Sequence, residues 1–82
     1  MQQRPLLIKI NPQDNVAIVV NDGGLAQGTY VEAQDITLVE AVPQGHKVLL
    51  TTLKENDPIV RYGEIIGYAN KDLNAGSWVN EA

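Results

Sequence analysis

The apolar residues of this chain occur in short runs separated by residues that are typical of turns. The runs cover residues 6–8, 16–20, 36–39, 48–50, 59–60 and 65–68. These lengths match β-strands and are too short for helices. The segments between them are rich in Gly, Pro, Asn and Asp, as at 21–24, 43–45, 56–58 and 74–76. The pattern predicts a mainly β fold of short strands and tight turns.

One pattern recurs along the chain: an apolar residue, two further residues, a glycine, two further residues and a second apolar residue. It occurs at 25–31, 42–48 and 73–79, and a fourth copy at 53–59 has Asn56 in place of glycine. Asn tolerates a left-handed backbone best after Gly, so each copy is interpreted as a turn held by two apolar anchors. The irregular spacing between copies excludes a solenoid. We therefore expect one compact, barrel-like domain over residues 1–82, with no more helix than a single turn at 22–27.

Composition and charge exclude several classes of function. The chain has a formal net charge of -4, and no basic cluster or basic-aromatic pattern that would favour nucleic-acid binding. No apolar run approaches the roughly 20 residues that span a bilayer, and the start at residues 1–5 lacks the long apolar segment expected of a secretory signal. The absence of cysteine excludes disulfides and thiolate chemistry. We expect a soluble, cytoplasmic protein without a nucleic-acid or membrane partner.

Catalytic motifs are scarce in these 82 residues. The chain contains one histidine, His46, and one serine, Ser77, which lies in a predicted turn, so neither a triad nor a self-contained metal site is expected. Close pairs of acidic residues, Asp14 with Asp22 and Glu55 with Asp57, are explained by turn capping or solvation. The glycines at 23, 24 and 28 lack the spacing of a phosphate-binding loop.

His46 is the chemically distinctive position, because it follows a predicted turn and precedes an apolar strand. Lys47, Lys54 and Arg61 follow it, and their side chains could converge on a carboxylate. The alternative is a half-buried surface histidine among solvated cations that balance nearby acidic residues. Three large aromatic side chains are interpreted as packing residues of the core or its rim: Tyr62, Tyr68 and Trp78.

Taken in order, five segments of the sequence resemble the amino-terminal domain of the galactarate/altronate dehydratase family. They are Asn-Val-Ala-Ile-Val-Val at 15–20, Leu-Ala-Gln-Gly-Thr at 25–29, Pro-Gln-Gly-His-Lys-Val at 43–48, Val-Arg-Tyr-Gly-Glu-Ile-Ile-Gly-Tyr-Ala at 60–69 and Gly-Ser-Trp-Val at 76–79. The resemblance covers nearly the whole chain and implies a SAF-type β-clip domain. Within the family, residues 21–25 and 76–78 look more like galactarate dehydratase than altronate dehydratase.

The resemblance also implies a function. Such enzymes are hydro-lyases that remove water from a sugar acid to give a 3-deoxy-2-keto product, with a divalent metal, expected to be iron, whose ligands come from outside this segment. It implies His46 as a candidate catalytic residue and Lys47, Arg61 and Tyr62 as candidate substrate-binding residues that help close the site. The expected partners are the sugar acid and the remaining catalytic domains or a large subunit.

Several alternatives stay open at this point. The chain is expected to be a fragment of a longer enzyme, or else a separately encoded small subunit, and to be inactive alone. It could instead serve a purely structural role in oligomerisation, or act as a stand-alone sugar-acid binding module. The sequence does not decide which sugar acid is used, whether the chain forms a homodimer, or whether His46 contacts substrate, metal or another subunit.

Overall fold

The regular structure of this domain consists of short strands. A computed structural model describes residues 4–79. The strands are β1 (Leu7–Ile8), β2 (Val16–Val19), β3 (Tyr30–Val31), β4 (Ile36–Thr37), β5 (Lys47–Leu49), β6 (Pro58–Arg61), β7 (Glu64–Tyr68) and β8 (Trp78–Val79). Within the described range there is no helix, and hence none that is long and apolar enough to cross a membrane. The mainly β fold predicted from the sequence is confirmed.

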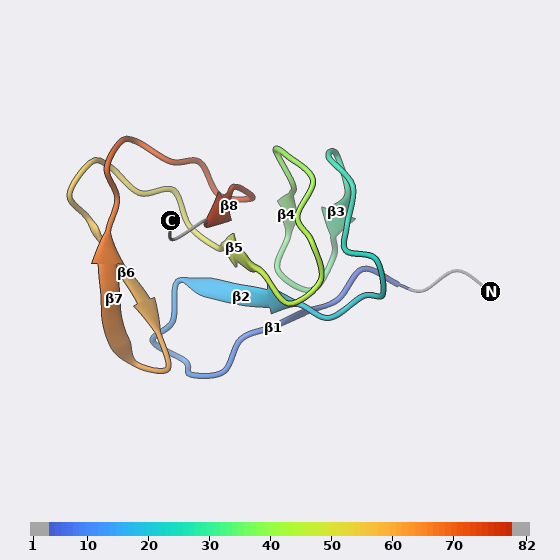
Figure 1. Cartoon of the computed structure of the whole chain (residues 1–82), viewed down its shortest axis with the longest axis horizontal. Helices are drawn as coiled ribbons and strands as arrows, with labels where there is room; N and C mark the ends of the chain where they lie inside the picture. The colour runs from blue at the N-terminus through green and yellow to red at the C-terminus, as the bar shows by residue number, and fades with distance from the viewer. Residues whose placement is uncertain (1–3, 80–82) are drawn as a thin grey trace.

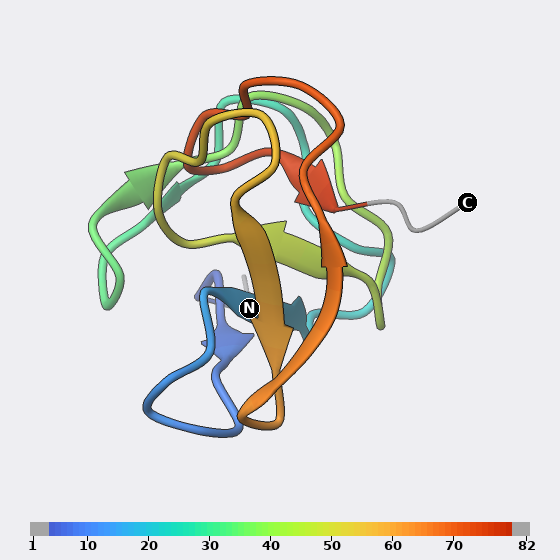
Figure 2. The same cartoon turned by 90° about the vertical axis from the view of Figure 1, so that its left-hand side faces the viewer.

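Four of the strands form one antiparallel sheet in the order β1-β2-β5-β8. Two hairpins, β3–β4 and β6–β7, are separate two-stranded units, and the second contains an irregularity between Ile59 and Val60. Figure 1 shows the β6–β7 hairpin at one end of the sheet and the β3–β4 hairpin towards the other end. Turned by 90°, β6 and β7 cross in front of β2 and β5 (Figure 2).

Each predicted apolar run contains a strand. The single helical turn that the sequence allowed at 22–27 does not form, because Gly23 and Gly24 have φ angles of 77° and 80°, which a right-handed helix does not accept. The run at 36–39 shortens to two residues, since the N–H groups of Leu38 and Val39 bond to Thr29 and Gly76 in two of the turns. The strands β3 and β8 were not among the predicted apolar runs.

The four copies of the repeated pattern all form the same turn. In each copy the first apolar residue makes an isolated bridge, Leu25 with Val42 and Leu53 with Leu73. The glycine, or the asparagine that replaces it, has a positive φ. The values are 84° at Gly28, 83° at Gly45, 75° at Asn56 and 94° at Gly76. Asn56 therefore adopts the left-handed conformation that its place in the pattern predicts.

Each turn is also bonded to a buried residue elsewhere in the chain. The N–H of the glycine or asparagine donates to the carbonyl of the buried residue at 2.7–2.8 Å. In return, the N–H of the buried residue donates at 2.8–3.0 Å to the carbonyl of the residue that follows the glycine or asparagine. The four residues that receive the turns are Leu38, Val19, Ala69 and Leu49. All of them are buried, so the repeated turn connects the surface loops directly to the core.

The core lies on both faces of the four-stranded sheet. Residues that are paired across strands project from the same face, and successive residues alternate between faces. One face carries Ala17, Val19 and Val48, which pack with the β3–β4 hairpin in the first cluster. The other face carries Val16 and Leu49, which pack with Ile59 and Ala69 of the β6–β7 hairpin in the second. Each hairpin thus covers one face.

The turn geometry predicts different costs for two glycine substitutions. Gly28→Ala places a Cβ on a residue with positive φ, which costs about 1–2 kcal/mol, and meets nothing within 4 Å. Gly76→Ala has the same backbone strain, and its Cβ would also collide with the carbonyl oxygen of Thr37. Urea unfolding should therefore show a larger loss of stability for Gly76→Ala. Equal losses in the two variants would contradict this account of the turns.

Candidate functional site

His46 occupies the position after the glycine in the second turn, at the start of β5. Its N–H donates to the carbonyl of Pro43 at 3.2 Å, and its carbonyl accepts from the N–H of Val19 at 3.0 Å. These backbone bonds fix the residue, while its side chain is exposed. The alternative of a half-buried surface histidine is therefore correct in the surface location and wrong in the burial.

The imidazole of His46 contacts the indole of Trp78 on β8. The Nε1–H of Trp78 donates to Nδ1 of His46 at 3.3 Å, and the two rings meet edge to face with centroids 5.3 Å apart. An Nδ1 that accepts a hydrogen bond leaves the proton of the neutral ring on Nε2. The arrangement thus orients His46 with Nε2–H as a hydrogen-bond donor.

The side chains at the same position in the other three turns serve their own turns. The hydroxyls of Thr29 and Ser77 donate to the carbonyls of Ala26 and Asn74 at 2.6 and 2.7 Å. The carboxylate of Asp57 accepts from the N–H of Lys54 at 2.9 Å. The side chain of His46 makes its hydrogen bond across the sheet instead, with Trp78. The turn therefore does not require a histidine, which points to a separate role for the ring.

The other predicted site residues lie in two places. Lys47 is half-buried on β5, paired with Ile18 and Val79. Arg61 ends β6, with its guanidinium carbon 5.0 Å from the centroid of the Tyr62 ring. Nε of Arg61 is buried and has no hydrogen-bond acceptor among residues 4–79. Tyr62 is 55% exposed, so of the two packing positions considered for it, core and rim, the core is excluded.

His46 and Arg61 lie towards opposite ends of β5. His46 immediately precedes the strand, whereas Arg61 follows Val60, whose carbonyl accepts from the N–H of Asn15. The carbonyl of Asn15 in turn accepts from Leu50, just beyond the other end of β5. About 13 Å of extended strand separates residues 46 and 50. The structure therefore brings His46 together with Trp78, and Arg61 together with Tyr62, as two separate pairings. Lys47 is next to His46 in the chain, but its register with Ile18 and Val79 places it on the other face of the sheet from Trp78.

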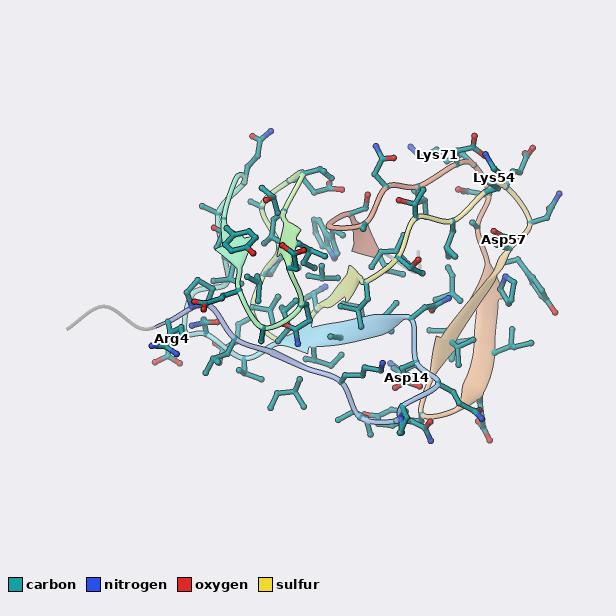
Figure 3. The ribbon with its side chains drawn as sticks, turned by 180° about the vertical axis from the view of Figure 1, so that it is seen from behind. Arg4, Asp14, Lys54, Asp57 and Lys71 are labelled. Carbon is teal, nitrogen blue, oxygen red and sulfur yellow. The ribbon has the colours of Figure 1, made fainter. Side chains whose placement is uncertain are left out.

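Lys54 lies apart from the residues with which it was grouped. It is exposed in the third turn, and Figure 3 shows it at the same end of the molecule as Asp57 and Lys71, far from Arg4. The neighbouring third and fourth turns are joined there by a bond of 2.9 Å from the N–H of Glu55 to the carboxylate of Asp72. Lys54 thus belongs to a solvated, mixed-charge surface.

Trp78 also lines an open groove of about 670 Å³, to which His46 does not contribute. Trp78 lines it together with Tyr68, Asn70 and Lys71 from the end of the β6–β7 hairpin. Glu40 lines the groove as well, and its carboxylate accepts from the N–H of Trp78 at 3.1 Å. Tyr68 is exposed and Trp78 is half-buried, so neither is a core residue, and both line this groove. Sequence reasoning missed Asn70 and Lys71, since neither stands in the repeated pattern or beside the histidine.

The β6–β7 hairpin is attached to the sheet by two polar side chains that precede β2. The amide of Asn15 donates to the carbonyl of Pro58 at 2.9 Å and accepts from the N–H of Val60 at 2.8 Å. The carboxylate of Asp14 accepts from the N–H of Gly63 at 2.8 Å and from that of Asn11 at 3.2 Å. Figure 3 shows Asp14 beside the turn of the hairpin. The capping role expected for this acidic residue is therefore observed.

The environment of Asp14 favours its ionised form. Burial of the carboxyl group raises its pKa, but the backbone N–H groups of Gly63, Tyr62 and Asn11 oppose this effect, together with the charge of Lys9. The net result is a pKa below the ordinary value of 3.8. A lowered pKa in the folded state means that the carboxylate stabilises the fold above the pKa of the unfolded chain. This contribution is lost as the pH falls through the folded-state value.

Replacing Asp14 by Asn should therefore lower the thermal unfolding midpoint at neutral pH and have a smaller effect in acid. Well below pH 3.8 the wild-type carboxyl is protonated as well, so the midpoints should converge. Asp22→Asn is the control, because Asp22 is exposed and accepts only a long bond of 3.4 Å from Gln44. A difference between wild type and Asp14→Asn that is independent of pH would contradict the role of the charge.

Comparison with known proteins places this fold in a family. The model of the altronate/galactarate dehydratase SAF domain matches residues 5–82. The chain belongs to this SAF domain family. It is 49% identical to the galactarate dehydratase (L-threo-forming) of Escherichia coli strain K12 over 75 residues, which are 92% of this chain and 14% of that protein. The family membership predicted from the quoted segments is confirmed.

Two altronate dehydratases are also similar to the SAF domain. Identity is 36% with that of Bacillus subtilis strain 168 and 43% with that of Escherichia coli strain K12, each over 89% of this chain. These values are lower than for galactarate dehydratase, in agreement with the preference drawn from residues 21–25 and 76–78. The chain spans 14–15% of the length of these relatives, so it corresponds to a small part of each.

A divalent metal was expected for the complete enzyme, with ligands from outside this segment. Across residues 4–79, no three side chains of His, Cys, Asp or Glu are grouped as a metal ion would require. His46 already directs Nδ1 towards Trp78. The described residues therefore do not fit a metal centre.

Proposed function

We propose that this SAF domain is an accessory part of a sugar-acid dehydratase, in which it helps to close the substrate site and does not catalyse the reaction alone. Family membership supports the class of enzyme, since the similar proteins are named galactarate and altronate dehydratases. The small share of each relative that the chain covers supports an accessory role. The sugar acid and the remaining parts of the dehydratase are the proposed partners.

The orientation of His46 is the observation that carries the proposal for the site. Trp78 holds the ring so that Nε2–H is the donor, on an exposed turn, and Trp78 itself lines an open groove. A sugar acid presents carboxylate and hydroxyl oxygens, which accept such a bond. Lys47 lies on the other face of the sheet, so its role in substrate binding stays a prediction from the family resemblance. Once the site closes, exclusion of bulk water would strengthen the bond from His46.

Arg61 and Tyr62 are not included in this contact. They lie towards the other end of β5 from His46, so the three side chains do not surround one carboxylate. Their role in substrate binding stays a prediction from the family resemblance. The buried, unpaired Nε of Arg61 is consistent with an acceptor supplied by another part of the dehydratase.

Replacing His46 by Ala in the assembled dehydratase should lower kcat/KM by about 10- to 100-fold. This is the effect of losing one hydrogen bond to a charged group, worth about 1.5–3 kcal/mol. His46→Gln retains an N–H donor at a similar reach and should restore part of the activity. Thr29→Ala is the matched control, because Thr29 holds the same position in the first turn but binds only its own backbone. Wild-type kinetics in His46→Ala would refute the proposal.

A structural role in assembly is the competing explanation, and deletion separates the two. If the domain closes the site, a dehydratase lacking residues 1–82 should keep its oligomeric state and lose its turnover. Sedimentation and steady-state kinetics of the truncated enzyme measure these two properties independently. Retained turnover together with a loss of assembly would favour the structural role.

A further inference from the structure

The face of the sheet that packs on the β6–β7 hairpin is only partly covered. The hairpin covers Val16 and Leu49, near the start of β2. Figure 1 shows β1 and the end of β2 extending away from this hairpin. By register, Ile8 pairs with Ile18 on the same face, and Ile18 pairs with Lys47. The part of this face formed by β1 and the end of β2 therefore lies outside the cover of the hairpin.

All the outward side chains of this uncovered part are aliphatic. Four residues form it, and it is called the β1–β2 face below: Leu6, Ile8, Ile18 and Val20. Leu6 and Val20 are adjacent, since the N–H of Val20 donates to the carbonyl of Leu6 at 3.4 Å. Leu6 and Ile8 are 48% and 47% exposed, Val20 is 38% exposed and Ile18 is half-buried. A solvated face of an antiparallel sheet normally carries polar residues at these positions.

The β1–β2 face offers its side chains, and not its strand edge, to a partner. The carbonyl of Leu6 points towards β2, so that of Leu7 points to the outer edge of β1. There the amide of Gln34 donates to Leu7 at 3.3 Å. Part of the edge is therefore already bonded within the domain. Contact through the aliphatic face does not require this bond to break.

The area of the β1–β2 face argues against a second copy of the chain as its occupant. Burying one aliphatic side chain fully corresponds to roughly 100 Å², so four partly exposed ones offer about 200 Å². Two copies that met through this face would bury about 400 Å², well below the roughly 1,200 Å² of a stable interface. A partner in the same polypeptide needs far less area, because linkage gives it a high effective concentration.

We propose that the β1–β2 face docks against the remaining part of the dehydratase polypeptide. The similar dehydratases contain this region within one longer chain, of which it is 14–15%, so most of their length lies outside the domain. The matched family region, residues 5–82, includes all four residues of the face. The inference rests on family membership and not on the role proposed for His46.

Cysteine labelling tests this docking directly, because the chain contains no cysteine of its own. Ile8→Cys places a thiol on the β1–β2 face. Ile65→Cys is the matched control, since Ile65 is also an exposed strand isoleucine, at 55%, but lies on the β6–β7 hairpin. The rate of modification by a thiol reagent is measured by mass spectrometry of the labelled peptide. Each variant is compared in the assembled dehydratase and in the 82-residue chain.

In the assembled dehydratase, position 8 should be labelled at least tenfold more slowly than position 65. In the 82-residue chain, which should sediment as a monomer, the two positions should be labelled at similar rates. Rapid labelling at position 8 of the dehydratase, or equal protection at both positions, would overturn the inference. Self-association of the 82-residue chain with protection of position 8 would also overturn it, in favour of a second copy. The kinetics of His46→Ala affect none of these outcomes.

Discussion

The structure depends on the two hydrogen bonds by which each turn is attached to a buried residue. The strands have two to five residues, and such short strands are marginally stable without further packing. In each copy, the left-handed residue turns its N–H inward to the carbonyl of a core residue, and the following carbonyl accepts from the same residue. The bonds satisfy backbone groups that would otherwise lie unpaired near the core. They also fix where every strand after a turn begins.

The repetition of this turn explains how a functional position can arise without loss of stability. The backbone makes all the bonds that the turn requires, so the side chain after the glycine is free to vary. In three copies it binds its own turn, through Thr29, Asp57 and Ser77. In the second copy the imidazole of His46 is held by Trp78 from the neighbouring strand. The site is thus a variation on a repeated structural unit.

The two ends of the four-stranded sheet have different surroundings. At one end, Asp14 and Asn15 attach the β6–β7 hairpin through charged and amide hydrogen bonds, and Arg61 packs on Tyr62. At the other end, the sheet exposes the aliphatic β1–β2 face, with Lys47 beside it. The family relatives are several times longer than this chain. A domain with one end covered by its own hairpin and an exposed aliphatic face at the other end is suited to a place inside a larger protein.

The sequence by itself determined the class of fold, the turns and the family. Glycine, or Asn56 in its place, marks the turns because the ability to adopt a positive φ is a local property of the residue. The length of an apolar run is also a local feature, and short runs predict strands. The segments that resemble the dehydratase family also occur in order along the chain, and they identified the family.

Only the tertiary structure decided which of these elements meet. The pairing of β5 with β8 brings Trp78 to His46, and the attachment of β6 to Asn15 carries Arg61 away from it, although Arg61 is nearer in sequence. The same register leaves the outward residues of β1 and β2 uncovered. These outcomes depend on strand pairings between distant residues, and the local pattern of apolar and turn residues does not encode that register.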